Sequence, residues 1–292
     1  MSAPYRYSRR IGSASGRQFI THGLQRRMMQ DLYHLFMTVS WPIIFASFAA
    51  FFFVFNLLFA VAYSLQANDI ANLNPAGYWG RFFFSVETFA TVGYGDMHPQ
   101  TPFAHIVAAI EIFIGLMSLA LITGMMFARF SKPTARFLFA RHVVVRPLNG
   151  ELTLMLRAAN ARQNIVMEAS ARLRLLRDEV TPEGYRIRRI QDLPLIRNRH
   201  PVFLFGWTML HVIDRASPLA GETEQSLSAA RAFLLLTVIG TDETTGQSLM
   251  ARQEYPASAV RWNYTYVDIL STDGDGIDHF DYTRFDDIEP LR

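Results

Sequence analysis

The sequence predicts an α-helical membrane domain of two spans with a re-entrant helix between them, followed by an all-β sandwich of immunoglobulin-like type. Three observations predict this order. Two long apolar runs almost free of charge lie in the first half, and a third apolar stretch between them is too short to cross a membrane. The second half changes to short alternating runs separated by turn residues.

Composition narrows the function classes. Hydrophobic residues make up 50% of the 292 residues and charged residues 18%, below the roughly 25% of a typical soluble domain. Cysteine is absent, which excludes disulfides and thiolate chemistry. No GxGxxG, nucleophile elbow or HExxH motif occurs, so neither an enzyme nor a cofactor is expected. The net charge of +3 is modest and basic residues gather beside the spans, which favours a membrane surface over nucleic acid.

Two segments precede the first span. Residues 1–27 are rich in arginine but lack the apolar run of a signal peptide, so we expect a mobile, basic cytoplasmic arm. In residues 28–40, apolar side chains recur at helical spacing opposite polar ones, which predicts an interfacial slide helix on the cytoplasmic leaflet. A plain extension of the first span is the alternative.

Residues 41–65 and 103–130 are the predicted outer and inner transmembrane helices. Each exceeds the ~20 helical residues that cross the hydrocarbon core, and Pro42 suits a first helical turn. A buried helix of a soluble protein is the alternative for the first run. Glu111 interrupts the second run, and an intramembrane carboxylate usually faces a cavity or a polar partner. We expect Glu111 to support the re-entrant segment from behind rather than to line a pore.

The charge of the loops predicts the orientation. Arginine is frequent before the first span and after the second, whereas residues 66–102 have no basic excess. Because basic loops stay on the cytoplasmic side, both termini are expected there, in a multi-pass protein of the cell inner membrane.

The re-entrant segment consists of a helix, residues 79–90, and the five residues 91–95, "TVGYG". Non-helical backbone at membrane depth is tolerated only where protein shields it or where it lines a water-filled cavity, so these five residues should line a pore. Gly93 and Gly95 allow the left-handed dihedrals that turn successive carbonyls towards one axis. Val92 and Tyr94 would point away from that axis and wedge the strand against the re-entrant helix.

The same five residues resemble the selectivity filter of potassium channels, whose backbone carbonyls replace the water shell of the ion. The resemblance implies sites for K⁺, the permeant ion, at Thr91, Val92, Gly93 and Tyr94, with Thr91 adding its hydroxyl. One chain supplies one strand, so a homotetramer around a central pore is required. The re-entrant helix would direct its negative C-terminal end towards the cation.

Beyond the filter, the chain resembles the inward-rectifier potassium channel family in its prokaryotic KirBac branch. The segments that carry the resemblance are residues 154–176, 211–223, 240–255 and 281–285. The resemblance covers most of the chain after the arm, and it implies a potassium-selective channel whose cytoplasmic domain and anionic lipids act on a gate in the inner helix.

The support of the filter departs from the family pattern. Glu87 matches the glutamate that the family carries in its pore helix. The usual partner of that glutamate is an arginine two residues after the filter, and Met97 occupies that position here. We therefore expect this filter to be braced differently, through Asp96.

The inner helix carries the expected gate. Gly115, Leu119, Thr123 and Phe127 recur every four residues on one helical face. By resemblance this face lines the inner cavity, and Phe127 forms a constriction that gates by dewetting. Gly115 and Gly124 are expected to act as hinges, because glycine weakens a helix locally. Ordinary packing or a lipid-facing position is the alternative for Phe127. Leu119 takes the family position of a cavity acid, so rectification should be weaker and rest on the cytoplasmic lining.

The cytoplasmic half begins with a predicted linker, residues 131–140, and continues as the β-sandwich, residues 141–292. Residues 223–231 are expected to form one short helix. The stretch "DGDGID", residues 273–278, resembles a calcium loop but lacks its closing glutamate, so a hairpin turn is predicted.

Three regulatory features are expected. By resemblance, a constriction called the G-loop maps to residues 240–249, with Gly240 and Gly246. His34 and His105 are candidate pH sensors. Basic residues beside the spans should attract anionic lipid head groups, although the positive-inside rule alone also explains them. The candidates for lipid binding are Arg26, Arg27, Arg129, Lys132 and Arg136.

Two other functions compete with this hypothesis. One is a non-conducting two-span receptor with a ligand-binding β-domain, which would not need the "TVGYG" loop. The other is a two-span channel gated by a nucleotide-sensing Rossmann domain, and the lack of a glycine-rich βαβ unit argues against it.

Overall fold

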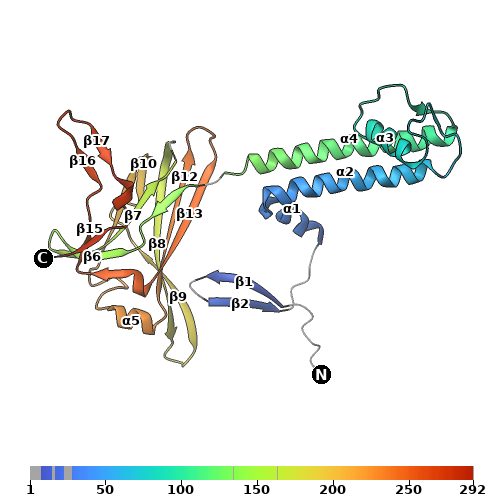
Figure 1. Cartoon of the computed structure of the whole chain (residues 1–292). Helices are drawn as coiled ribbons and strands as arrows, with labels where there is room; N and C mark the ends of the chain where they lie inside the picture. Colours follow the sequence, from blue (N-terminus) through green and yellow to red (C-terminus); the bar gives the residue numbers. More distant parts are fainter. Residues whose placement is uncertain (1–7, 15–16, 23–27, 134, 163, 292) are drawn as a thin grey trace. The chain divides into compact units, whose positions relative to one another are not determined.

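The computed structural model describes residues 8–14, 17–22, 28–133, 135–162 and 164–291. Its contacts divide the chain into two units (Figure 1). The membrane unit is Leu24–Lys132, and the β unit is Pro133–Arg292 together with Met1–Gly23.

The membrane unit is helical. Its helices are α1 (Met28–Thr38), α2 (Trp41–Tyr63), α3 (Tyr78–Phe89) and α4 (Pro102–Phe130). Among the described residues, only α2 and α4, with 23 and 29 residues, are long and apolar enough to cross a membrane. Both begin with a proline in the first turn, where a missing N–H leaves no hydrogen bond unmade. The hydroxyl of Thr101 accepts a hydrogen bond from the amide of Ala104 at 3.2 Å and caps α4.

The short helix α3 packs against α2 through aromatic side chains. The rings of Tyr63 and Phe84 lie 5.2 Å apart, and those of Phe52 and Phe89 lie 5.8 Å apart. Gly80 lets the preceding turn approach the helix, because a Cβ there would lie 1.9 Å from the carbonyl oxygen of Pro75. The helix that precedes the "TVGYG" strand is therefore held firmly in its own chain.

The β unit contains two five-stranded sheets. The first has the strand order β10-β8-β12-β13 with β9 paired to β8, and the second has the order β11-β7-β6-β14 with β5 paired to β7. The strands are β5 (Phe137–Phe139), β6 (Val143–Leu148), β7 (Glu151–Asn160), β8 (Val166–Val180), β9 (Arg186–Leu193), β10 (Arg199–Phe203), β11 (Gly206–Val212), β12 (Phe233–Asp242), β13 (Ser248–Pro256) and β14 (Val260–Trp262).

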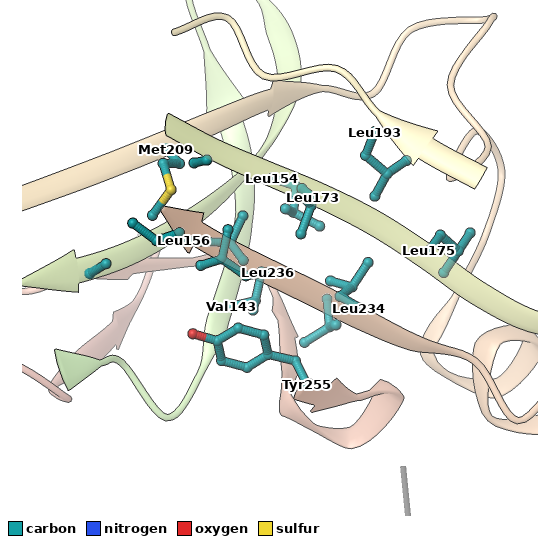
Figure 2. Close-up of a cluster of buried hydrophobic side chains, with 14 of the residues drawn as sticks. Val143, Leu154, Leu156, Leu173, Leu175, Leu193, Met209, Leu234, Leu236 and Tyr255 are labelled. Carbon is teal, nitrogen blue, oxygen red and sulfur yellow. The ribbon is translucent and has the colours of Figure 1, made fainter. Parts of the chain in front are cut away.

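One apolar core joins the two sheets. Leu156 of β7, Leu173 of β8 and Leu236 of β12 belong to the same buried cluster (Figure 2). Burial alternates along β12, as expected for a strand with one face on the core. Full burial of one such leucine contributes about 1.5–3 kcal/mol. The predicted all-β second half is confirmed.

Smaller elements complete the β unit. They are helix α5 (Glu224–Ala229), the 3₁₀ turns Ala257–Ala259 and Tyr282–Arg284, and the strands β15 (Tyr264–Tyr266), β16 (Leu270–Thr272), β17 (Asp278–Phe280) and β18 (Ile288–Pro290). The carboxylate of Asp273 accepts the amides of Asp275 and Ile277 at 3.0 and 2.9 Å and closes the β16–β17 turn. This segment is a hairpin turn, as predicted.

Two segments expected to lack regular structure contain strands. Within the predicted arm, β1 (Ser8–Ala14) pairs antiparallel with β2 (Arg17–His22). Within the predicted linker 131–140, Phe137–Phe139 forms β5, because Leu138 pairs with Ala159 of β7 and the flanking aromatic residues pack on the core. Periodicity over so few residues is too weak to distinguish a strand from a loop.

Candidate functional site

The "TVGYG" strand leaves the C-terminal end of α3 in a tight turn. The carbonyl oxygen of Glu87 accepts hydrogen bonds from the amides of Val92 and Gly93 at 2.8 and 3.3 Å. Gly93 and Gly95 have φ of 55° and 90°, in the left-handed region that the sequence analysis expects. An added Cβ would meet no atom within 4 Å at either glycine, so the backbone dihedral alone requires glycine there.

Thr91 also has a left-handed backbone, which the sequence analysis expected only for Gly93 and Gly95. Its φ is 57°, and a β-branched residue rarely adopts this conformation. Such outliers collect at functional sites, where the surrounding structure holds them in place. The side chains of Val92 and Tyr94 are 51% and 77% exposed in the single chain, so they are not wedged against their own α3.

Asp96, the predicted brace of the filter, is held through its main chain. The carboxylate of Asp96 is exposed, and the residue contributes its main-chain oxygen, which accepts a hydrogen bond from the side-chain amide of Asn72 at 2.9 Å. Met97 is 7% exposed and packs in an apolar cluster with Ile70 and Phe84.

A buried polar cluster links α2, α3 and α4. The carboxylate of Glu111 accepts hydrogen bonds from the hydroxyls of Tyr63, at 2.7 Å, and Ser85. Ser85 also contacts the side-chain oxygen of Asn56 at 3.0 Å, and all four side chains are buried. Sequence reasoning identified Glu111 but missed its partners, although polar residues inside apolar runs were the available signal.

The inner-helix residues divide into two groups. Leu119, Thr123 and Phe127 are exposed in the single chain, and Phe127 is 73% exposed. Gly115 is buried, and a Cβ there would lie 2.4 Å from the carbonyl oxygen of Phe89. Gly115 therefore allows the close approach of α4 to the end of α3, and its role as a hinge stays a prediction. Gly124 has open space around it. Thr91, Gly115 and Leu119 line one pocket of about 330 Å³.

The lipid-binding candidates differ in their surroundings. Arg26 and Arg27 lie outside the described residues. Lys132 and Arg136 are exposed. The guanidinium of Arg129 donates to the carbonyl oxygens of Phe36 and Val39 and lies 4.5 Å from the centre of the Trp41 ring. Arg129 is thus engaged inside the membrane unit rather than free for a head group. The candidate pH sensors His34 and His105 are exposed.

The predicted G-loop is the turn between β12 and β13. The carboxylate of Asp242 accepts the amides of Thr244 and Thr245, both at 2.9 Å, and the side-chain amide of Asn164. These hydrogen bonds hold the pKa of Asp242 below its usual range, and the one from the Thr245 amide has the largest effect. Gly240 lies so close to β8 that a Cβ would meet Val166 at 2.4 Å, and Gly246 has a φ of 65°. Asp242 thus joins this turn to the β7–β8 connection.

His211 is a buried histidine that sequence reasoning did not single out. Its Nδ1 lies 2.7 Å from the carbonyl oxygen of Pro194, and its Nε2 lies 2.8 Å from the hydroxyl of Ser217. A neutral ring satisfies both, with Nδ1 donating and Nε2 accepting. Burial lowers the pKa of His211 from its usual value.

This burial predicts a pH-dependent stability. Because the folded pKa is depressed, the unfolded state binds the proton first, and the free energy of unfolding falls as pH drops below about 6.5. The fall should not exceed about 1.4 kcal/mol per pH unit for this group. We expect a shallower pH dependence for His211→Gln, measured by urea unfolding of the detergent-solubilised protein with tryptophan fluorescence. Identical slopes for both proteins would contradict this assignment.

Two family models match this chain. The family model described as the inward rectifier potassium channel C-terminal domain matches residues 137–292, and the model described as ion channel matches residues 31–132. The inward rectifier potassium channel Kirbac3.1 of Paramagnetospirillum magnetotacticum is 36% identical over 289 residues, with 99% of this chain and 98% of that protein covered. The chain belongs to the inward rectifier potassium channel family.

Vertebrate members of the inward rectifier family are similar over shorter shares of their length. The ATP-sensitive inward rectifier potassium channel 8 of Mus musculus is 26% identical, with 89% of this chain and 68% of that protein covered. The G protein-activated inward rectifier potassium channel 1 of Bos taurus is 27% identical, with 97% and 61% covered. Membership of this ion channel family confirms the predicted fold class and the expectation that the chain is not an enzyme.

Proposed function

We propose that the chain is one subunit of a homotetrameric, potassium-selective channel in which four "TVGYG" strands line a central pore. The observation that carries this proposal is the strand itself. It follows a short helix between two spanning helices, and its two glycines have left-handed φ. The exposure of Val92 and Tyr94 supports the tetramer, because neighbouring subunits would cover them.

Ion selectivity would arise at the backbone. The carbonyl oxygens of Thr91, Val92, Gly93 and Tyr94 would replace the water shell of K⁺, and the Thr91 hydroxyl would add a ligand at the inner end. The C-terminal end of α3 carries partial negative charge and would favour a cation below the filter. Glu87 contributes by its carbonyl oxygen, which fixes the first turn of the strand.

Gating would occur on α4. Four copies of Phe127 would form an apolar constriction at the cytoplasmic end, with Leu119 and Thr123 lining the cavity above it. The side chain of Phe127 is 73% exposed in the single chain, which suits a residue that faces a pore. Both termini would lie in the cytoplasm, and anionic lipids would contact exposed Lys132 and Arg136.

Liposome flux tests this proposal against the non-conducting receptor. The purified protein, reconstituted into liposomes, should form tetramers and take up rubidium in a potassium-competed, barium-blocked manner. A receptor would form no conducting pathway, so liposomes with and without protein would take up rubidium equally. That outcome would contradict the channel function.

A further inference from the structure

An ion pair joins the pore helix α3 to Asp69, which lies in the connection between α2 and α3. Arg81, in the first turn of α3, donates from Nη2 to Oδ1 of Asp69 at 2.8 Å and from Nε to Oδ2 at 3.2 Å. The side chain of Asp69 is 1% exposed and that of Arg81 is 16% exposed. A two-point contact between a guanidinium and a carboxylate fixes direction as well as distance.

The main chain of Asp69 is bonded to the segment that leaves the filter. Its carbonyl oxygen accepts a hydrogen bond from the amide of Gln100 at 2.8 Å. Directly after Asp69, β3 (Ile70–Ala71) pairs antiparallel with β4 (His98–Pro99). One residue thus joins α3, through its side chain, to the strand beyond the filter, through its backbone.

Two further contacts hold the residues between the filter and β4. Asn72, which follows β3, donates its side-chain amide to the carbonyl oxygen of Asp96. Met97 fills an apolar socket that includes Tyr63, Ile70 and Phe84. Together with the Glu87 carbonyl at the inner end, these contacts fix the strand at both of its ends.

We propose that Arg81 and Asp69 are positioning residues that brace the filter from its outer side. With Asn72 and Met97 they form the outer brace, which takes over the task of the glutamate–arginine pair that Met97 rules out. The inference rests on the proposed function, because it assumes that "TVGYG" conducts K⁺.

The outer brace is needed because the filter strand has no ladder of its own. Left-handed residues at alternate positions, Thr91, Gly93 and Gly95, direct carbonyls towards an axis, so these carbonyls are not available to a neighbouring strand. The strand can keep its shape only if both ends are held. Because Arg81 and Asp69 are largely buried, removing one partner leaves the other charge without compensation and should move β3 and β4 away from α3.

The test compares Arg81→Met and Asp69→Asn with wild type and with a matched control, Gln100→Ala. The Gln100 side chain is exposed, and its brace contact uses only the backbone amide. All four proteins are purified as tetramers, reconstituted, and measured for the ratio of rubidium to sodium uptake and for barium block. We expect both brace variants to lose selectivity by about tenfold. A loss of this size requires only about a third of the free energy that breaking a buried ion pair usually costs.

The pair should also act as a unit. The double variant Arg81→Met, Asp69→Asn is expected to lose no more selectivity than either single variant. If Arg81→Met fails to assemble, Arg81→Lys keeps the charge but loses the two-point contact, and it should assemble with reduced selectivity. Wild-type selectivity in the brace variants would overturn the brace alone. Absence of selective flux in wild type would overturn the proposed function and the brace with it.

Discussion

Replacing Gly93 with alanine is expected to abolish rubidium flux while leaving the tetramer assembled. Gly93 has a φ of 55°, and its Cβ would meet no neighbouring atom. The cost is therefore conformational, roughly 1–2 kcal/mol for each left-handed residue other than glycine. In the variant, rotation of the peptide plane at residue 93 relieves this cost and turns a carbonyl oxygen away from the pore axis. Four copies of the change act on one ion pathway.

Gly184→Ala is the matched control. Gly184 has a φ of 88° in the β8–β9 turn, and a Cβ there also meets no atom within 4 Å. The same backbone cost should appear as a small loss of stability in the β unit with unchanged flux. Selective flux through Gly93→Ala tetramers at the wild-type rate would show that this backbone position does not shape the ion pathway.

Replacing Glu111 with leucine is expected to give the second largest effect, a loss of both flux and tetramer stability. The carboxylate is fully buried and accepts hydrogen bonds from Tyr63 and Ser85. Leucine would leave the Tyr63 hydroxyl without an acceptor, at about 1–3 kcal/mol, and would leave the Ser85 hydroxyl with Asn56 alone. Because Ser85 lies on α3, the loosened contact would reach the helix that carries the filter.

Glu111→Gln separates hydrogen bonding from charge. Its amide oxygen can accept from Tyr63, and its NH₂ can donate to Ser85, whose own hydroxyl can turn to Asn56. We expect near wild-type flux and tetramer melting for Glu111→Gln, and a marked decrease in both for Glu111→Leu. Equal loss in the two variants would mean that the negative charge, rather than the hydrogen bonds, is required.

The features that the sequence predicted well are local ones. Apolar runs indicated α2 and α4, and "TVGYG" carries its backbone requirement in Gly93 and Gly95. Alternating short runs indicated the sheets of the β unit. Each depends on residues adjacent in sequence, so periodicity and residue type are sufficient.

The features that the sequence did not predict depend on contacts between distant segments. Asp69 and Arg81 lie in different elements, and no pattern marks them as a pair. The partners of Glu111 come from α2 and α3, and the contact of Gly115 with Phe89 joins α4 to the end of α3. Arg129 similarly looked like a surface cation, whereas main-chain carbonyls of α1 and the turn after it occupy its guanidinium.

The most direct test of the central claim, that the "TVGYG" strand lines a potassium-selective pore, is the reversal potential of reconstituted channels. Planar bilayers are measured with potassium on one side and an equal concentration of sodium on the other. The account predicts a large bi-ionic potential that reports a high ratio of potassium to sodium permeability, and a shift of about 59 mV towards zero in Arg81→Met, as a tenfold loss of selectivity requires. A reversal potential near zero in the wild-type protein would contradict the account.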